Sequence, residues 1–500
     1  MADEKREIER KYESDDSGLP DLTGVGGVTA VLDKGVVELD AMYYDTADER
    51  LAADSLTLRR RTGGADAGWH LKFPVAPGIR DEIRAPLSDT VPEEIAALVR
   101  SRVRDAELIP LVRLRSARDV RHLVDADGVL LAEASVDAVT AERLGGKGGA
   151  AQWTEIEVEL ADGGDPAFLD LVEKRLRRAG VQPSRAPSKL ARALEQTAGR
   201  KRRRKDKRAR PVTASDHVLA YLRAQRDVLV ELDPAVRRDV PDAVHRMRVA
   251  TRRARSTLRS FRPVLDRTVT DPIGVELKWL AGELGVGRDQ EVLAERLTTA
   301  LDTVPPTLIT GPVRERLVSW SETGHGSAQS HLAGVLDSRR YLTLLDTLDR
   351  LLADPPLRKA GGKRPEKVLG KAVRKDLATL SALVEEALGA PPGKERDTAV
   401  HEARKKAKRT RYAAEAATKA LGEPARALTA SMKSLTTLLG DHQDSVMARL
   451  TLLELSAVAH AAGESTFTYG LLYGREEARA AAAEAELPAL WREITQRTSG

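Results

Sequence analysis

Charged residues alternate with apolar ones along most of the first 195 positions of this 500-residue chain. Because alternate residues of a β-strand point to the same face, each such segment predicts a strand with one charged and one apolar face. Turn residues such as Gly63-Gly64 and Asp127-Gly128 separate the segments. The pattern predicts strands near residues 7–12, 43–46, 56–61, 69–73, 80–84, 111–115, 130–139 and 153–160, and helices near 91–104 and 165–179.

A charged sheet face tolerates burial only where its charges are paired or line a wet cavity. A closed barrel whose lumen carries the charged positions meets this condition. We therefore expect residues 1–195 to form a closed antiparallel β-barrel with a charged interior.

Helical periodicity replaces this alternation after residue 212, and proline pairs such as Pro305-Pro306 mark breaks between helices. Part of this half occurs twice, because one charged segment recurs 156 residues later. Two related halves packed about a pseudo-two-fold axis would bring both copies to one central groove. The predicted helices run near 213–232, 240–262, 273–285, 288–303, 312–322, 338–352, 364–388, 396–421, 425–439, 442–462 and 466–486.

The two patterns together predict an α+β multidomain protein. Its parts are the barrel at 1–195, a linker at 196–211 and an all-α duplicated helical-bundle domain at 212–500. Nine of the eleven residues from Arg200 to Arg210 are basic, so the linker would repel itself into an extended form. A nuclear address or a nucleic-acid-binding arm is the alternative for the same run.

Composition narrows the function classes. The chain has no cysteine, which excludes disulfides and thiolate chemistry and favours a reducing compartment. It has no run of 18 apolar residues and no apolar signal region, so we expect a cytoplasmic protein without a membrane partner. The net charge of +5 conceals an asymmetry, because residues 1–199 carry −9 and residues 200–500 carry +14. An acidic module joined to a basic one suggests two tasks.

The first predicted strand places Glu7, Glu9 and Lys11 on one face. Two carboxylates beside an ammonium are costly to bury unless a divalent or phosphorylated ligand joins them. Acids at both ends of the module would gather Mg²⁺ or Mn²⁺ through oxygen ligands. Paired arginines and lysines on the other strands would hold phosphate oxygens. A charged face on an exposed edge strand is the alternative for this pattern.

The order of these positions resembles the CYTH domain of the triphosphate tunnel metalloenzymes. The opening Glu7-x-Glu9-x-Lys11 is similar to the family's signature, and later elements follow in the same order over residues 4–195. The resemblance implies an eight-stranded tunnel that binds a triphosphate and hydrolyses it with a divalent metal. Arg84 stands where an acid is expected and His70 where a small polar residue is common, so the choice of triphosphate stays open.

The resemblance also implies site residues. The catalytic group is Glu7, Glu9, Lys11 and Lys72. The substrate-binding group is Arg59, Arg61, Arg80, Glu82, Arg113, Arg115 and Lys189. The ligands for Mg²⁺ or Mn²⁺ are Glu7, Glu9, Asp137, Glu155, Glu157 and Glu159.

The repeated segment of the second half carries a stripe of cations. On a helix, His245, Arg248, Arg252 and Arg255 fall within an arc of roughly 80°, and the copy that begins at His401 does the same. Such a run of charges is most often a helix face exposed to solvent. Like charges one turn apart repel, however, and a solvated face usually mixes in acids. Two helices that both keep the stripe indicate a polyanion as ligand.

The two segments resemble the CHAD domain, named for its conserved histidines, over about 210–495. The resemblance implies binding of inorganic polyphosphate, and such domains often follow a CYTH domain. The implied contact residues are His245, Arg248, Arg252, Arg255, Lys278, His401, Arg404, Lys408, Arg411 and Lys433. The two histidines would either gain charge near their ordinary pKa when the polyanion binds or stay neutral hydrogen-bond donors.

The favoured hypothesis is a Mg²⁺- or Mn²⁺-dependent triphosphatase joined to a polyphosphate-binding module, in the cytoplasm and in association with polyphosphate granules. A second hypothesis is a non-enzymatic polyphosphate binder. A third is nucleic-acid binding through the basic half, against which stands an aromatic content of only 3%. The sequence leaves open which triphosphate enters the barrel, whether both modules act on one polymer, and the oligomeric state.

Overall fold

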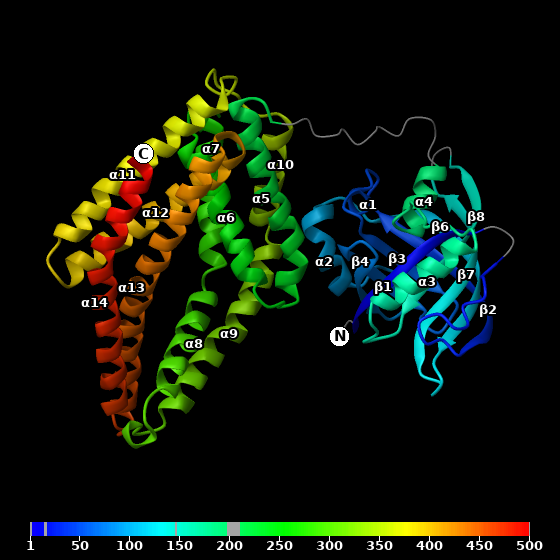
Figure 1. Ribbon diagram of the computed structural model, residues 1–500, viewed down its shortest axis with the longest axis horizontal. Coiled ribbons are helices and arrows are strands. Elements are labelled where there is room, and N and C mark those ends of the chain that lie inside the picture. The colour runs from blue at the N-terminus through cyan, green and yellow to red at the C-terminus, as the bar shows by residue number, and fades with distance from the viewer. Residues whose placement is uncertain (1–2, 15–17, 146–147, 198–210, 500) are drawn as a thin grey trace. The chain divides into compact units, whose positions relative to one another are not determined.

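The structure is a computed structural model that describes residues 3–14, 18–145, 148–197 and 211–499. The chain divides into two compact units, residues 1–207 and 208–500 (Figure 1). The segment predicted as a linker, 196–211, lies mostly outside the described residues, so its conformation stays a prediction.

Eight antiparallel strands of the first unit close into a barrel, as the alternating pattern predicts. The order around the barrel is β1-β5-β4-β3-β2-β6-β7-β8, and β1 closes it by pairing with both β5 and β8. The strands are β1 (Asp3–Ser14), β2 (Ala30–Asp45), β3 (Thr57–Thr62), β4 (Gly68–Ala76), β5 (Ile79–Ala85), β6 (Ile109–Val124), β7 (Leu130–Arg143) and β8 (Ala150–Leu160).

Short helices cover the apolar positions of the barrel. The unit contains α1 (Arg50–Ala53), α2 (Glu93–Val103), α3 (Ala167–Arg178) and α4 (Lys189–Gln196). Leu71 packs in one core cluster with residues of α2, and Ile156 packs in another with residues of α3. In a third cluster α4 contributes Leu190 and Leu194 beside Val139. Because these helices bury the apolar positions, the charged positions of the same strands are left to face the lumen.

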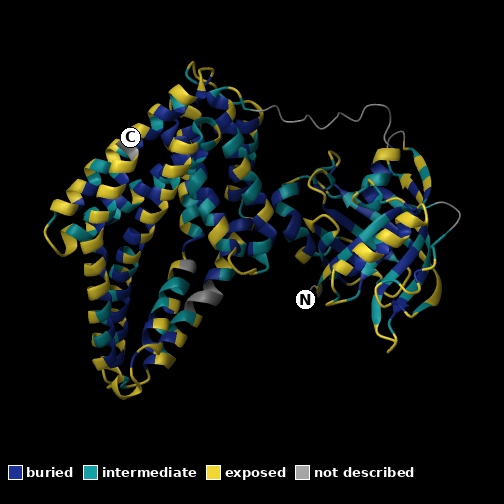
Figure 2. Ribbon diagram, in the orientation of Figure 1, coloured by how far each residue is buried: buried dark blue, intermediate teal, exposed yellow. Residues whose placement is uncertain are grey.

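The second unit is helical throughout its described elements, apart from one isolated bridge. Figure 2 shows the buried faces of these helices turned toward one another. The helices are α5 (Ala214–Arg237), α6 (Ala243–Ser260), α7 (Arg267–Glu283), α8 (Arg288–Asp302), α9 (Val313–Asp337), α10 (Arg339–Ala353), α11 (Pro365–Gly389), α12 (Lys394–Leu421), α13 (Glu423–Ala461) and α14 (Phe467–Ser499), with a 3-10 turn at Pro306–Leu308. None of the described helices is both long and apolar enough to span a membrane.

The two halves of this unit differ where the sequence predicts them to match. The first copy breaks between α7 and α8, but the helices predicted at 425–439 and 442–462 are the single helix α13. Three glycines, Gly282, Gly285 and Gly287, crowd the first junction, whereas Gly440 stands alone in the second. One interior glycine costs a helix only about 1 kcal/mol relative to alanine, which is too little to end it.

Candidate functional site

The barrel lumen holds a cavity of about 460 Å³ whose wall is dominated by charge. Ten lining residues are basic and seven are acidic. The basic ones are Lys5, Lys11, Lys34, Arg59, Arg61, Lys72, Arg80, Arg84, Arg118 and Lys189. The acidic ones are Glu7, Glu9, Asp66, Glu133, Glu157, Glu159 and Asp162. The structure thus brings Glu7, Glu9, Lys11 and Lys72, named from the sequence, to one wall.

Two glutamates of β1, Glu7 and Glu9, each contact an ammonium in this wall. Lys72 forms a short ion pair with Glu7, and Lys11 Nζ lies 3.0 Å from Glu9 Oε2. Burial raises the pKa of Glu7 despite the opposing charge of Lys72. For Glu9 burial is again the largest single influence and acts in the same direction, but Lys11 and Lys72 together outweigh it and the pKa is lowered. Both carboxylates are buried and paired with lysines. A ligand that binds here must therefore replace these ion pairs with new contacts to the lysines or to the carboxylates.

A second group of carboxylates lies on β7 and β8. One oxygen from each of Asp137, Glu155 and Glu157 lies within 4.8 Å of the others, and all three residues are buried. Lys189 Nζ contacts all three, at 2.7, 2.9 and 2.5 Å, and Arg118 donates to Asp137 and Glu157. Three hard oxygen donors suit Mg²⁺ or Mn²⁺. The residues therefore fit a divalent ion, provided that Lys189 gives up its place.

Two arginines of β3, Arg59 and Arg61, face the same cavity as the arginines of β5. Arg59 Nη1 lies 3.4 Å from the Tyr43 hydroxyl, and Arg80 donates to the Pro187 carbonyl at 2.7 Å. Burial, together with the charges of Arg59 and Arg118, lowers the pKa of Arg61 to about 9. A guanidinium loses affinity for its proton only where positive charge is concentrated and poorly solvated. The lumen is therefore prepared for an anion.

Two predicted residues lie elsewhere, and sequence reasoning missed others. Arg113 and Arg115 are on the outer face of β6, where their guanidinium groups contact Asp40, so they are not part of the lumen. Arg118, three residues further along β6, lies inside because it pairs with Val37, another lining residue. Directly opposed residues of antiparallel strands share a face, so Arg118 faces the lumen as Val37 does. Lys5 was missed as well.

Three other residues singled out in the sequence, Glu159, Glu82 and His70, form hydrogen bonds beside this wall. Glu159 accepts a hydrogen bond from Lys5 at 2.9 Å, and Glu82 is fully buried 2.9 Å from His70 Nδ1. Burial lowers the pKa of His70 to about 4, so its imidazole is neutral near pH 7. Arg84 donates to Glu82, which explains how an arginine is accommodated where an acid was expected.

In the helical unit, α6 and α12 pack against each other and bring parts of both cationic stripes together. The charges of Arg248, Arg252 and Arg404 all act on Lys408. Burial and these three neighbours lower the pKa of Lys408 to about 7. Burial and the same repulsion lower the pKa of Arg252. We call Arg248, Arg252, Arg404 and Lys408 the cation cluster.

Among the described residues, one member of the cation cluster forms an ion pair, although the charges of Asp289 and Asp444 also act on Arg404. Arg248 makes a two-pronged ion pair with Asp289, at 2.5 and 2.9 Å. Within the part of the chain that the structure describes, no ion pair or hydrogen bond joins the side chains of Arg252, Arg404 or Lys408 to a partner. The Nε atoms of Arg252 and Arg404 are buried and unbonded. Such groups cost free energy until a ligand satisfies them.

In each copy of the repeat, a glycine leaves space for an arginine of the cation cluster. A Cβ atom added to Gly285 would lie 2.8 Å from Arg248 Nη2, and one added to Gly440 would lie 3.1 Å from Arg404 Nη2. The absence of a side chain lets each guanidinium lie close to backbone, at the turn between α7 and α8 for Arg248 and within α13 for Arg404. The repeat of Gly285 at Gly440 is therefore explained by space for an arginine.

The remaining predicted contact residues lie around the cluster or away from it. Arg255 neighbours Arg259 and Arg409 in a second basic patch. Arg411 donates to the Thr436 hydroxyl at 3.2 Å and lies over the ring of Tyr412. His401 Nδ1 lies 2.5 Å from Gln443 Oε1. His245, Lys278 and Lys433 are exposed.

Comparison with known proteins agrees with this division. The CYTH domain family matches residues 5–194, and the CHAD domain family matches residues 220–453. A protein of Mycobacterium tuberculosis, named only as uncharacterized and found in two strains, is 39% identical over 98% of this chain and 96% of its own length.

Two solved structures resemble part of the chain. PptA from Streptomyces chartreusis is 22% identical, with a TM-score of 0.48, over 56% of this chain and 99% of that one. The CHAD domain from the plant Ricinus communis is 23% identical, with a TM-score of 0.45, over 59% of this chain and 97% of that one. With the family matches and the mycobacterial relative taken together, the chain belongs to the family of proteins in which a CYTH domain is followed by a CHAD domain.

Proposed function

We propose that the barrel hydrolyses inorganic triphosphate, or a related triphosphate, with Mg²⁺ or Mn²⁺, and that the helical unit binds inorganic polyphosphate. One observation carries this proposal: both units bury concentrated cations that protein carboxylates only partly neutralise. A chain of phosphates supplies negative charge at short, regular intervals, and guanidinium groups bind phosphate oxygens in two-pronged fashion.

In the barrel, the lumen arginines of β3, β5 and β6 would bind the phosphate oxygens and stabilise charge that develops on the transferred phosphoryl group; they are Arg59, Arg61, Arg80, Arg84 and Arg118. Lys11 and Lys72 would orient the chain against β1. A divalent ion bound by carboxylates such as Glu9 and Glu157 would neutralise phosphate charge and position a water molecule.

Ion and phosphate should bind together. Arg118 and Lys189 form ion pairs with the carboxylates of β7 and β8. An arriving phosphate chain gives these two cations new partners, and the freed carboxylates can then accept the metal. Each ligand thus removes the electrostatic cost of the other, which explains how charges so closely paired remain available for catalysis.

Substitutions inside and outside the barrel test the enzymatic claim. We expect Glu9→Gln and Arg118→Ala to lower phosphate release from tripolyphosphate with Mg²⁺ or Mn²⁺ by about 100-fold or more. Glu9→Gln removes an anionic ligand of the divalent ion, and Arg118→Ala removes a cation that stabilises charge on the reacting chain. Arg115→Ala is the matched control, since Arg115 projects from the outer face of the same strand, and it should keep near-wild-type activity. Equal rates in all four proteins would refute the claim.

In the helical unit, the phosphate chain would lie along the cation cluster and bond its unsatisfied guanidinium groups. We expect Arg252→Ala or Arg404→Ala to weaken long-chain polyphosphate binding by about 10- to 100-fold, since a charged hydrogen bond contributes about 1.5–3 kcal/mol. Arg340→Ala serves as the control because Arg340 already pairs with Glu276 at 2.6 Å on the surface of the same unit. Calorimetric titration measures all three.

Competition with duplex DNA at fixed salt distinguishes the nucleic-acid alternative. The account predicts that long-chain polyphosphate displaces DNA at lower phosphate concentration. Preferential binding of DNA, or unchanged polyphosphate affinity in both cluster variants, would contradict the assignment.

Lys408 should make this binding depend on pH. Its pKa of about 7 in the free protein rises when the polyanion binds, because the ligand's negative charge favours the ammonium. Below pH 7 the group is charged in both states and affinity is full. Above pH 7 binding must take up a proton, so affinity falls as pH rises. Titrations between pH 6 and 9 should show this slope in the wild type but not in Lys408→Arg.

A further inference from the structure

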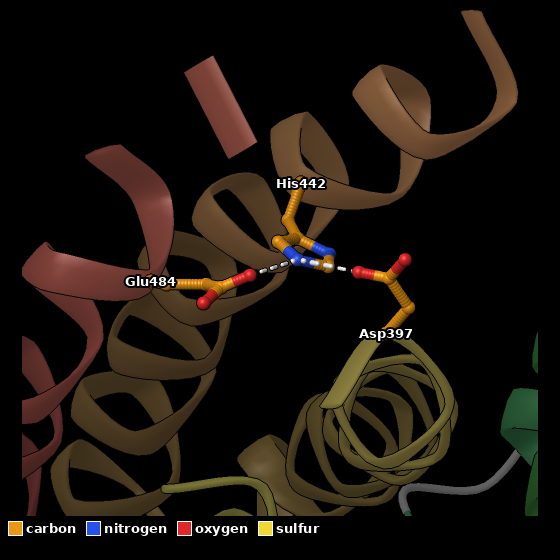
Figure 3. A group of neighbouring side chains, drawn as sticks. All are labelled: Asp397, His442 and Glu484. Carbon is orange, nitrogen blue, oxygen red and sulfur yellow. Dashed lines mark hydrogen bonds and ion pairs between the residues drawn. The ribbon is translucent and has the colours of Figure 1, made fainter. Parts of the chain in front are cut away.

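A buried histidine with two carboxylates lies apart from the cation cluster's four members. His442 Nε2 lies 3.0 Å from Glu484 Oε1 and 3.3 Å from Asp397 Oδ1 (Figure 3). The three residues come from α13, α14 and α12, and His442 is only 1% exposed. Neither the tunnel nor the polyphosphate proposal uses them.

His442 has too few hydrogens to satisfy the acceptors around it. A neutral imidazole carries one N–H, so Nε2 can donate one hydrogen to two acceptor oxygens. His442 Nδ1 is buried and has no hydrogen-bond partner among the described residues. No donor therefore holds Nδ1 as an acceptor and locks the hydrogen on Nε2. Two carboxylate oxygens therefore lie close to Nε2, but the single hydrogen on this nitrogen can form a good hydrogen bond with only one of them.

Two arginines orient the carboxylates toward that point. Arg396 donates to Glu484 Oε2 at 2.9 Å, and Arg449 donates to Asp397 Oδ2 at 3.3 Å. Arg396 is itself held by the Ala390 carbonyl at 2.6 Å. One oxygen of each carboxylate is therefore bound by an arginine while the other faces His442. Outer partners that fix the direction of ligand groups are the usual support of a metal centre.

We propose that Asp397, His442 and Glu484 bind a divalent transition-metal ion of the Zn²⁺ type. All three ligand atoms lie within 4.8 Å of one another. Ligands about 2.0–2.1 Å from a tetrahedral ion are about 3.3 Å apart, which matches the two separations from Nε2. One imidazole and two carboxylates leave a fourth position for water.

The chemistry of this set differs from that of the barrel. Imidazole favours Zn²⁺ and its neighbours in the transition series, whereas the all-oxygen groups of the lumen favour Mg²⁺ or Mn²⁺. Ligation through Nε2 would move the imidazole hydrogen to Nδ1, where no acceptor awaits it. That loss makes the site weaker than a fully supported zinc centre. The ion would join α12, α13 and α14 and stabilise their packing.

Metal analysis of the full chain tests the proposal with Zn²⁺ as the probe. Metal-free protein is loaded with Zn²⁺, desalted and analysed, and its thermal unfolding is recorded. We expect Glu484→Gln and Asp397→Asn each to lose one equivalent of Zn²⁺ and the zinc-induced rise in Tm. His460→Ala, an exposed histidine of the same helix, should keep both. Glu9→Gln should also keep both, which separates this site from the barrel.

Cobalt gives a second readout that does not depend on variants. Co²⁺ in the wild-type protein should show the intense visible absorption of four-coordinate nitrogen and oxygen ligation. Wild type that binds no Zn²⁺ beyond the amount bound by Glu484→Gln, or that gives only weak octahedral Co²⁺ bands, would overturn the proposal. His442 would then be a hydrogen-bonded clamp between helices.

Discussion

Repulsion among buried cations is the constraint on which both units of this protein depend. Two unit charges 4 Å apart interact by about 4 kcal/mol at the effective dielectric of a protein surface. Ten cations and seven acids line the lumen. The cation cluster holds four cations, of which only Arg248 forms an ion pair within the described part of the chain, with Asp289. A fold keeps such an arrangement only if its scaffold over-determines it or a ligand relieves it.

The two units hold their cations by different means. In the barrel, strand alternation places charges on one face while α2, α3 and α4 bury the apolar positions. Carboxylates share the lumen, so its charges are closely paired before a ligand arrives. In the helical unit, duplication and the packing of α6 on α12 bring like charges together, and glycine makes room for their side chains. Its charges remain unsatisfied, which suits a module that binds rather than reacts.

Much of this was predictable from the sequence because side-chain periodicity is strict. The period of two put Glu7, Glu9 and Lys11 on one face and predicted the closed barrel that the structure shows. The repeat of His245 at His401 predicted that two cationic helices would meet, and they do so through Arg252 and Lys408. Both inferences rest on spacing within one element or on an internal copy.

The rest depends on pairing between elements, which spacing along one strand does not contain. β6 carries arginines on both of its faces. Only its register with β2 shows that Arg118 faces inward and Arg115 outward. The sequence does not single out His442, because its partners lie 45 residues before and 42 residues after it on other helices. The continuity of α13 through Gly440 was missed because one glycine resembles a helix end.

Thermal unfolding of the full chain with and without long-chain polyphosphate tests the central claim most directly. If phosphate supplies the counter-charge that the cation cluster lacks, saturating ligand should raise the unfolding temperature of the helical unit, with about 2.7 kcal/mol gained at a hundredfold excess over Kd. The gain should shrink as salt rises. No rise, or an equal rise in a protein that carries both Arg252→Ala and Lys408→Met, would contradict the account.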